Sequence, residues 1–99
     1  MAARRLLIQG RVQGVGFRYF VAREAQALGV TGWVRNLPDG RVEAVVAAEE
    51  TALDVLEGRI WQGPPLARVI SVESGAAEAP ADGEFRIVSS VRRREARLC

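Results

Sequence analysis

A glycine-rich segment between an expected strand and an expected helix holds the residues best suited to chemistry. It reads GRVQGVGFR over residues 10–18. The backbone N–H groups of such a loop can point at one centre, and a helix N-terminus adds unpaired N–H groups and partial positive charge. Arg18 lies in the first helical turn, from which its guanidinium can bind two phosphate oxygens. The segment therefore predicts a pocket for an anion of phosphate size.

The position of Arg18 is informative because a cation at a helix N-terminus is unfavourable by a few tenths of a kcal/mol. A bound anion between the two would reverse that sign. The spacing alone leaves a second interpretation open, in which the glycines only serve a tight turn. The segment is neither a Walker loop nor a dinucleotide fingerprint, since GxxxxGK[ST] and GxGxxG are both missing.

The second candidate is the stretch GWVRNL over residues 32–37, which contains Asn36 at the expected end of a strand. Taken alone, Asn36 fits a hairpin turn better than a catalytic role, because asparagine is common there. We expect Trp33 in the core or at a packed edge, Arg35 toward solvent, and Asp39 in the turn.

Several classes of site are excluded by composition. The chain has no histidine, and its single cysteine is Cys99, so an intrachain disulfide, a Cys/His zinc cluster and a Ser-His or Cys-His nucleophile pair are all ruled out. The acidic residues do not cluster. Glu43 is expected on the exposed face of a strand, and three others surround a helix start, where carboxylates are common. We therefore expect no metal and no cofactor.

The charge distribution separates a near-neutral body from a basic end. All 14 basic residues are arginines, and residues 1–91 carry 10 of them against 11 acids, a net charge of −1. We expect one domain over residues 1–90 and a flexible basic tail over residues 91–99, solvated or in weak contact with a polyanion or membrane surface. Because the basic excess is confined to the tail, no nucleic-acid partner is expected. No signal peptide or membrane span is apparent, which predicts a cytoplasmic location.

Hydrophobic periodicity and turn residues predict a β-α-β-β-α-β order with a short final strand. Gly29 is expected to end the first helix, and a capping box at Thr51 to Asp54 to begin the second. The expected strands and helices are residues 5–11, 17–28, 31–37, 41–47, 51–62, 67–74 and 84–88. This order predicts an α+β, ferredoxin-like, two-layer sandwich with an antiparallel sheet and both helices on one face.

Taken together, these segments resemble the acylphosphatase family. Residues 10–18 resemble the family signature around its phosphate loop and catalytic arginine, and GVTGWVRN over residues 29–36 resembles the second signature, which ends in the catalytic asparagine. A later family segment resembles residues 61–69, so the likeness covers roughly residues 5–89. Leu37 is a departure, because some members have a hydroxyl residue after the asparagine.

The resemblance implies hydrolysis of acyl phosphates to a carboxylate and inorganic phosphate, without metal or cofactor. It assigns Asn36 to positioning of the attacking water, because an amide has no useful basicity near neutral pH. The phosphoryl group would be held by the Arg18 side chain and by the backbone N–H groups of Gln13, Gly14, Val15, Gly16 and Phe17. Expected ligands are a small acyl phosphate, and phosphate or sulfate as a product-like anion.

Domain length favours a stand-alone enzyme, and we expect a monomer. An inactive domain that only binds anions, and a protein that contacts nucleic acid through its tail, are the alternatives.

Overall fold

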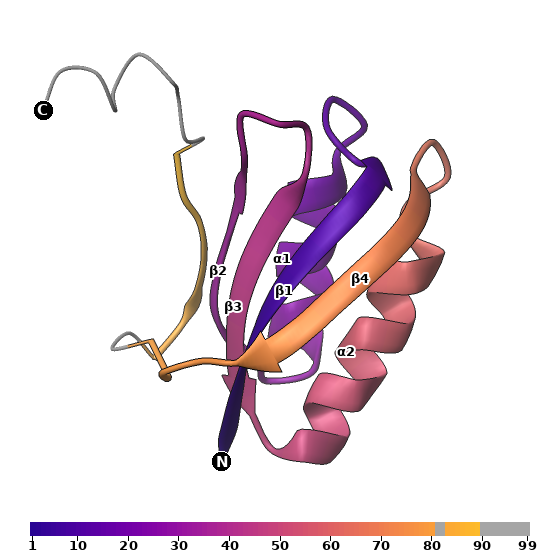
Figure 1. Ribbon diagram of the computed structural model, residues 1–99. Helices are drawn as coiled ribbons and strands as arrows, with labels where there is room; N and C mark the ends of the chain where they lie inside the picture. Colours follow the sequence, from indigo (N-terminus) through magenta and orange to yellow (C-terminus); the bar gives the residue numbers. More distant parts are fainter. Residues whose placement is uncertain (81–82, 90–99) are drawn as a thin grey trace, which may run out of the picture.

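The computed structural model describes residues 1–80 and 83–89, and it contains five strands and two helices in the expected order (Figure 1). The basic tail predicted for residues 91–99 lies outside the described residues. The elements are β1 (Ala2–Arg11), α1 (Phe17–Ala27), β2 (Thr31–Asn36), β3 (Val42–Ala48), α2 (Glu50–Gln62), β4 (Arg68–Ala76) and β5 (Phe85–Ile87). Neither helix is long and apolar enough to cross a membrane, among the residues described.

The five strands form one sheet in the order β4-β1-β3-β2-β5, with both helices on one face (Figure 1). The pairs β1–β4, β1–β3 and β3–β2 are antiparallel, and only β5 pairs parallel, with β2. The ferredoxin-like α+β architecture is thus confirmed, with the short β5 making the sheet mixed. Because β3 lies between β1 and β2, these two strands run in the same direction and end at the same end of the molecule.

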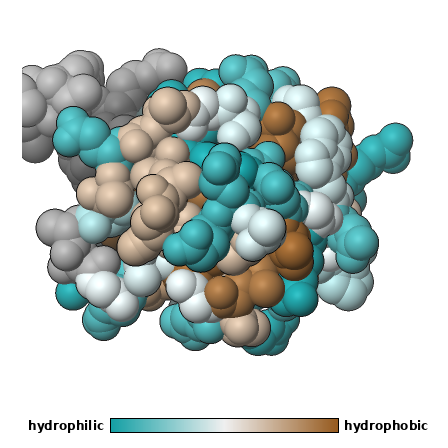
Figure 2. Space-filling view, turned by 90° about the horizontal axis from the view of Figure 1, so that it is seen from below, coloured by the Kyte–Doolittle hydropathy of each residue, from teal (hydrophilic) through white to brown (hydrophobic). Residues whose placement is uncertain are grey.

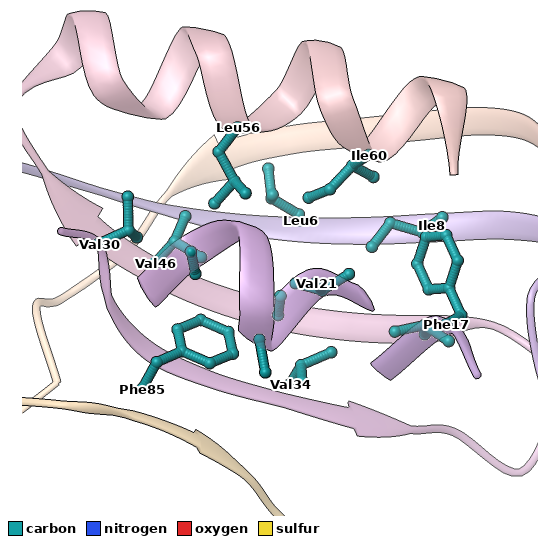
Figure 3. Packing of buried hydrophobic residues seen from close by; sticks show 14 of the residues in the cluster. Leu6, Ile8, Phe17, Val21, Val30, Val34, Val46, Leu56, Ile60 and Phe85 are labelled. Carbon is teal, nitrogen blue, oxygen red and sulfur yellow. The ribbon is translucent and has the colours of Figure 1, made fainter. Parts of the chain in front are cut away.

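The core lies between the sheet and the helices (Figure 3). Alternate residues of β1, Leu6 and Ile8, face the helices, as the period of two in a strand requires. They meet Leu53, Leu56 and Ile60 of α2, which are fully buried. Figure 2 views the end of the molecule opposite the β1–α1 loop, where hydrophilic and hydrophobic residues are intermixed on the surface.

The helix ends agree with the sequence at one helix and differ at the other. At the end of α1, Gly29 N–H donates to Gln26 O (3.2 Å) and Val30 N–H to Ala25 O (2.8 Å), the paired bonds of a Schellman motif.

The capping box predicted for α2 is wrong. This helix begins at Glu50, its N-cap is Glu49, and no side chain in the described part of the chain caps it. The expected partner in the box, Asp54, instead pairs with Arg4 of β1 at 2.8 Å. Its carboxylate is therefore drawn toward the sheet.

Glu43 corrects a second expectation, because it is buried rather than exposed. It lies on the sheet face away from the helices, yet only 3% of it is accessible. Arg5 of β1 donates from Nε to one carboxylate oxygen, and Arg35 of β2 donates to the other at 2.7 Å. Arg35 also lies over the Trp33 ring, 4.9 Å from its centroid, so it is not directed simply into solvent as expected. The two guanidiniums cover the carboxylate from both flanking strands.

The environment of Glu43 also sets its protonation. Burial by itself raises the pKa of the carboxyl, but the hydrogen bonds and charges of Arg35 and Arg5 outweigh that effect. The pKa is therefore lowered, and Glu43 is ionised as the centre of a three-residue ion-pair cluster.

Candidate active site

The glycine-rich segment forms an irregular loop whose two ends are fixed in the core. Val12 before it and Phe17 after it are each only 1% exposed. Between them, Gly14 and Gly16 have φ angles of 74° and 75°. A Cβ at either glycine would meet nothing within 4 Å, so it is the left-handed backbone, and not crowding, that favours glycine at both positions. Residues 13–17 are called the anion loop below.

The N-terminus of α1 has no capping group of its own. Its N-cap is Gly16, no side chain among the described residues accepts from its N–H groups, and its first turn contains no acid. The first hydrogen bond of the helix runs from Phe20 N–H to Gly16 O (3.0 Å), so the three preceding N–H groups lack helical acceptors. Helix starts normally use Ser, Thr, Asp or Asn for this purpose. The anion loop therefore leads into an electropositive helix end that would be stabilised by a negative group.

Arg18, the second residue of α1, adds a full positive charge to this end. Its side chain is half-buried, and within residues 1–80 and 83–89 the guanidinium makes no hydrogen bond or ion pair. Several other arginines of the described chain pair with carboxylates, such as Arg4 with Glu57 and Arg59 with Glu24. The guanidinium of Arg18 thus stays free to bind an anion at the uncapped helix end.

Asn36 is the last residue of β2 and pairs with Val42 in the ladder to β3. Its side-chain Oδ1 is buried and has no hydrogen-bond partner among the described residues. Leaving a buried acceptor unpaired costs about 1–3 kcal/mol, and such groups call for a functional explanation. The turn interpretation does not supply one, because the turn begins only after Asn36. Asp39 is the turn residue, as predicted: its carboxylate accepts from Arg41 N–H (3.0 Å) and Nε (2.8 Å).

The anion loop and the end of β2 are joined by a side chain for which the sequence predicts no role. Gln13 Nε2 donates to Leu37 O at 2.8 Å and to Arg41 O at 2.9 Å. From the sequence, only the backbone N–H of Gln13 was expected to take part in the site. No pattern in one sequence could have found these bonds, because they depend on the end of β1 lying beside the β2–β3 turn. The structure thus brings the loop and the residue after Asn36 together.

Comparison with known proteins decides the family. The acylphosphatase family model matches residues 4–87, which includes the anion loop, Arg18 and Asn36. The chain belongs to the acylphosphatase family. The acylphosphatase of Thermococcus kodakarensis is 54% identical over 83 residues, which cover 84% of this chain and 91% of that protein.

Solved structures of other proteins share the fold. The crystal structure of acylphosphatase from Bacillus subtilis superposes with a TM-score of 0.84 at 38% identity, over 89% of this chain and 99% of that one. Full-length HypF, in a phosphate- and nucleotide-bound form, superposes with a TM-score of 0.79 at 32% identity, over 90% of this chain but 12% of that one.

Membership of the acylphosphatase family establishes the reaction class. The chain is a hydrolase that acts on acid anhydrides, and its substrates are small-molecule acyl phosphates. Among the described residues, no group of three or more His, Cys, Asp and Glu side chains is placed to hold a metal ion.

Proposed function

We propose that this acylphosphatase hydrolyses acyl phosphates without a metal ion, with the phosphoryl group held by Arg18 and by the backbone N–H groups of the anion loop. The observation that carries the proposal is the uncapped N-terminus of α1, which has Arg18 and no acid in its first turn. An anion there satisfies N–H groups that nothing else in the described chain satisfies. It also converts the unfavourable position of Arg18 into a favourable one.

The proposed chemistry relies on charge stabilisation. In phosphoryl transfer the charge is spread over the equatorial oxygens, and the main task of the protein is to hold and stabilise them. Fixed N–H donors and a planar guanidinium suit that task, because they need no rearrangement when the transition state forms. Arg18 and the loop together would surround the oxygens from the helix side.

Asn36 would position the attacking water. Its buried Oδ1 has no hydrogen-bond partner among the described residues, so it can accept a hydrogen bond from a water O–H. The water oxygen forms a bond to phosphorus while the bond from phosphorus to the acyl oxygen breaks, and the electron pair leaves with the carboxylate. An amide cannot take up the proton, so it passes to the substrate or to solvent. A carboxylate is a good leaving group, which makes catalysis without a histidine reasonable.

The test is hydrolysis of an aromatic acyl phosphate, followed by its loss of ultraviolet absorbance with a chelator present. Removing one preorganised donor from a comparable site costs about 3–4 kcal/mol, near a thousandfold in rate. We expect Arg18→Ala to lose at least that factor, and Asn36→Ala to lose kcat while still binding phosphate. Arg23→Ala is the matched control, because Arg23 is an exposed arginine on the same helix.

Four results would count against the proposal. Turnover retained in Arg18→Ala, or reduced equally in Arg23→Ala, would remove the role of the guanidinium. Turnover retained in Asn36→Ala would remove the role of the amide. Loss of wild-type activity in chelator would contradict the metal-independent mechanism. The cytoplasmic location and the monomeric state stay predictions from the sequence.

A further inference from the structure

The Gln13 side chain donates two hydrogen bonds to the β2–β3 turn, and every donor and acceptor involved has a partner. A side-chain amide nitrogen has two hydrogens, and here one donates to Leu37 O and the other to Arg41 O. Each carbonyl has a second partner within the turn: Gly40 N–H donates to Leu37 O (3.2 Å), and Leu37 N–H donates to Arg41 O (2.8 Å). Both lone pairs of both carbonyls are thereby used. Two acceptors facing one amide also fix which end of it is the nitrogen.

The connection bridges two segments that the sheet itself does not hold together. The ladder between β1 and β3 ends at the pair Ile8–Val42, and the ladder between β2 and β3 ends at Asn36–Val42. Beyond Val42, the β2–β3 turn and the chain that follows β1 project past the paired strands. Among the described residues, the two bonds of Gln13 are the hydrogen bonds that join the turn to the anion loop.

We propose that the Gln13 side chain is a positioning residue, which sets the placement of the Asn36 amide relative to the anion loop. Leu37, whose carbonyl it binds, follows Asn36 directly in the chain. The inference rests on the proposed function, in which the loop holds the phosphoryl group and Asn36 holds the water. Attack in line with the leaving group requires that the water on Asn36 keeps a fixed position relative to the phosphoryl group in the loop. A misplacement of about 1 Å can lower a rate by about a hundredfold.

The first arm of the test separates binding from turnover. Gln13→Met keeps the length of the side chain and removes both hydrogen bonds. We expect kcat to fall about 10- to 100-fold, because the Asn36 amide is no longer held in place relative to the anion loop. The anion loop itself should keep its shape, because the buried Val12 and Phe17 fix its two ends. The substrate KM and the inhibition constant of inorganic phosphate should change less than about threefold, since the groups that bind the phosphoryl oxygens are unchanged. Gln26→Met, at an exposed glutamine of α1, is the control and should leave both quantities unchanged.

The second arm is a double-mutant cycle with Asn36→Ala. If Gln13 acts through Asn36, the Gln13→Met substitution should change kcat less than about threefold once the amide of Asn36 is gone. A loss of equal size in both backgrounds would overturn the positioning role. So would an unchanged kcat in folded Gln13→Met, or a rise in the phosphate inhibition constant that matches the loss of kcat.

The outcomes separate this inference from the proposed function. If Asn36→Ala lowers kcat strongly and Gln13→Met does not reduce it, the inference fails and the proposed function stands. If Asn36→Ala retains turnover, the proposed function itself fails. Gln13→Asn, which keeps the amide but cannot span to both carbonyls, is expected to behave like Gln13→Met. Failure of both variants to fold, judged by circular dichroism, would make Gln13 a structural residue and overturn the proposal.

Discussion

Replacement of Glu43 by glutamine tests whether the buried ion-pair cluster stabilises the sheet. Gln keeps one acceptor oxygen for one guanidinium, but its NH₂ group then faces the other as a second donor. The change thus removes one hydrogen bond to a charged group, which is worth about 1.5–3 kcal/mol. The Arg5 and Arg35 side chains are 50% and 36% exposed, so water hydrates the guanidinium that loses its partner. We therefore expect a loss of about 2 kcal/mol, toward the lower part of that range.

The assay is unfolding of Glu43→Gln by urea and by heat. For a domain of this size, a loss of about 2 kcal/mol lowers Tm by roughly 8–16 °C. It should lower the urea midpoint without changing the m-value, since the surface exposed on unfolding is the same. Glu73→Gln is the matched control, because Glu73 is an exposed glutamate in the sheet, on β4. It should shift stability by less than about 0.5 kcal/mol.

Equal shifts in Glu43→Gln and Glu73→Gln would refute the reasoning, because the burial of Glu43 and its two partners would then contribute nothing. A more stable Glu43→Gln variant would show that the free-energy cost of desolvating the carboxylate exceeds its stabilisation by Arg5 and Arg35, as occurs for some buried ion pairs. A changed m-value would place the effect in the unfolded chain instead.

Three further predictions concern pH and the anion loop. The folded-state pKa of Glu43 lies below its ordinary value of 4.5. The ionised carboxylate should therefore contribute its full stabilisation above pH 4.5 and lose it as the pH falls through the lowered pKa. Urea titrations at acid pH should show a smaller loss of stability in Glu43→Gln than in the wild type. Because the chain has no histidine, kcat should be nearly flat from about pH 5 to 8, and a steep bell in the rate profile would reveal a titrating group that the mechanism omits. Gly16→Ala should lower stability by about 1–2 kcal/mol, because φ is 75° and the new Cβ makes no compensating contact. The strained loop should also lower kcat. An unchanged urea midpoint would contradict this prediction.

The elements themselves were predictable from the sequence because their signals are local. The turn at Pro38-Asp39-Gly40 needs only its own residues, and Asp39 does accept from Arg41 N–H two residues later. The first helix shows its buried side at Phe17, Val21 and Ala25, and Gly29 marks its end. Element type, order and the fold class followed from such features, and the two candidate segments could be placed at strand ends.

Burial on the open sheet face was not predictable, because it depends on strand register. The alternation in β3 correctly places Glu43 on the face away from the helices. Its exposure, however, is decided by Arg35 directly opposite on β2 and by Arg5 on the other flanking strand. Nothing in the local sequence of Glu43 indicates that two guanidiniums will cover it.

The capping box at Thr51 failed for a related reason, since a long-range partner competed for its carboxylate. Asp54 bonds to Arg4 of β1, fifty positions earlier in the chain. The bonds of Gln13 to the β2–β3 turn also depend on segments that are distant in sequence. Side-chain roles that require two elements to be neighbours become visible only once the sheet order is known.

The placement of β3 between β1 and β2 has a consequence for how activity arises during folding. The phosphate-binding segment and Asn36 are only about two dozen positions apart in the chain, yet their strands never pair with each other. The segment from β1 to β2 cannot by itself place the two parts of the site side by side. β3 must first pair with both β1 and β2, and its pairing with β1 closes a longer loop of the chain. Such non-local pairing is slow compared with helix formation. Refolding chains should therefore regain helical signal before turnover, so that catalytic competence marks a late event, the insertion of β3.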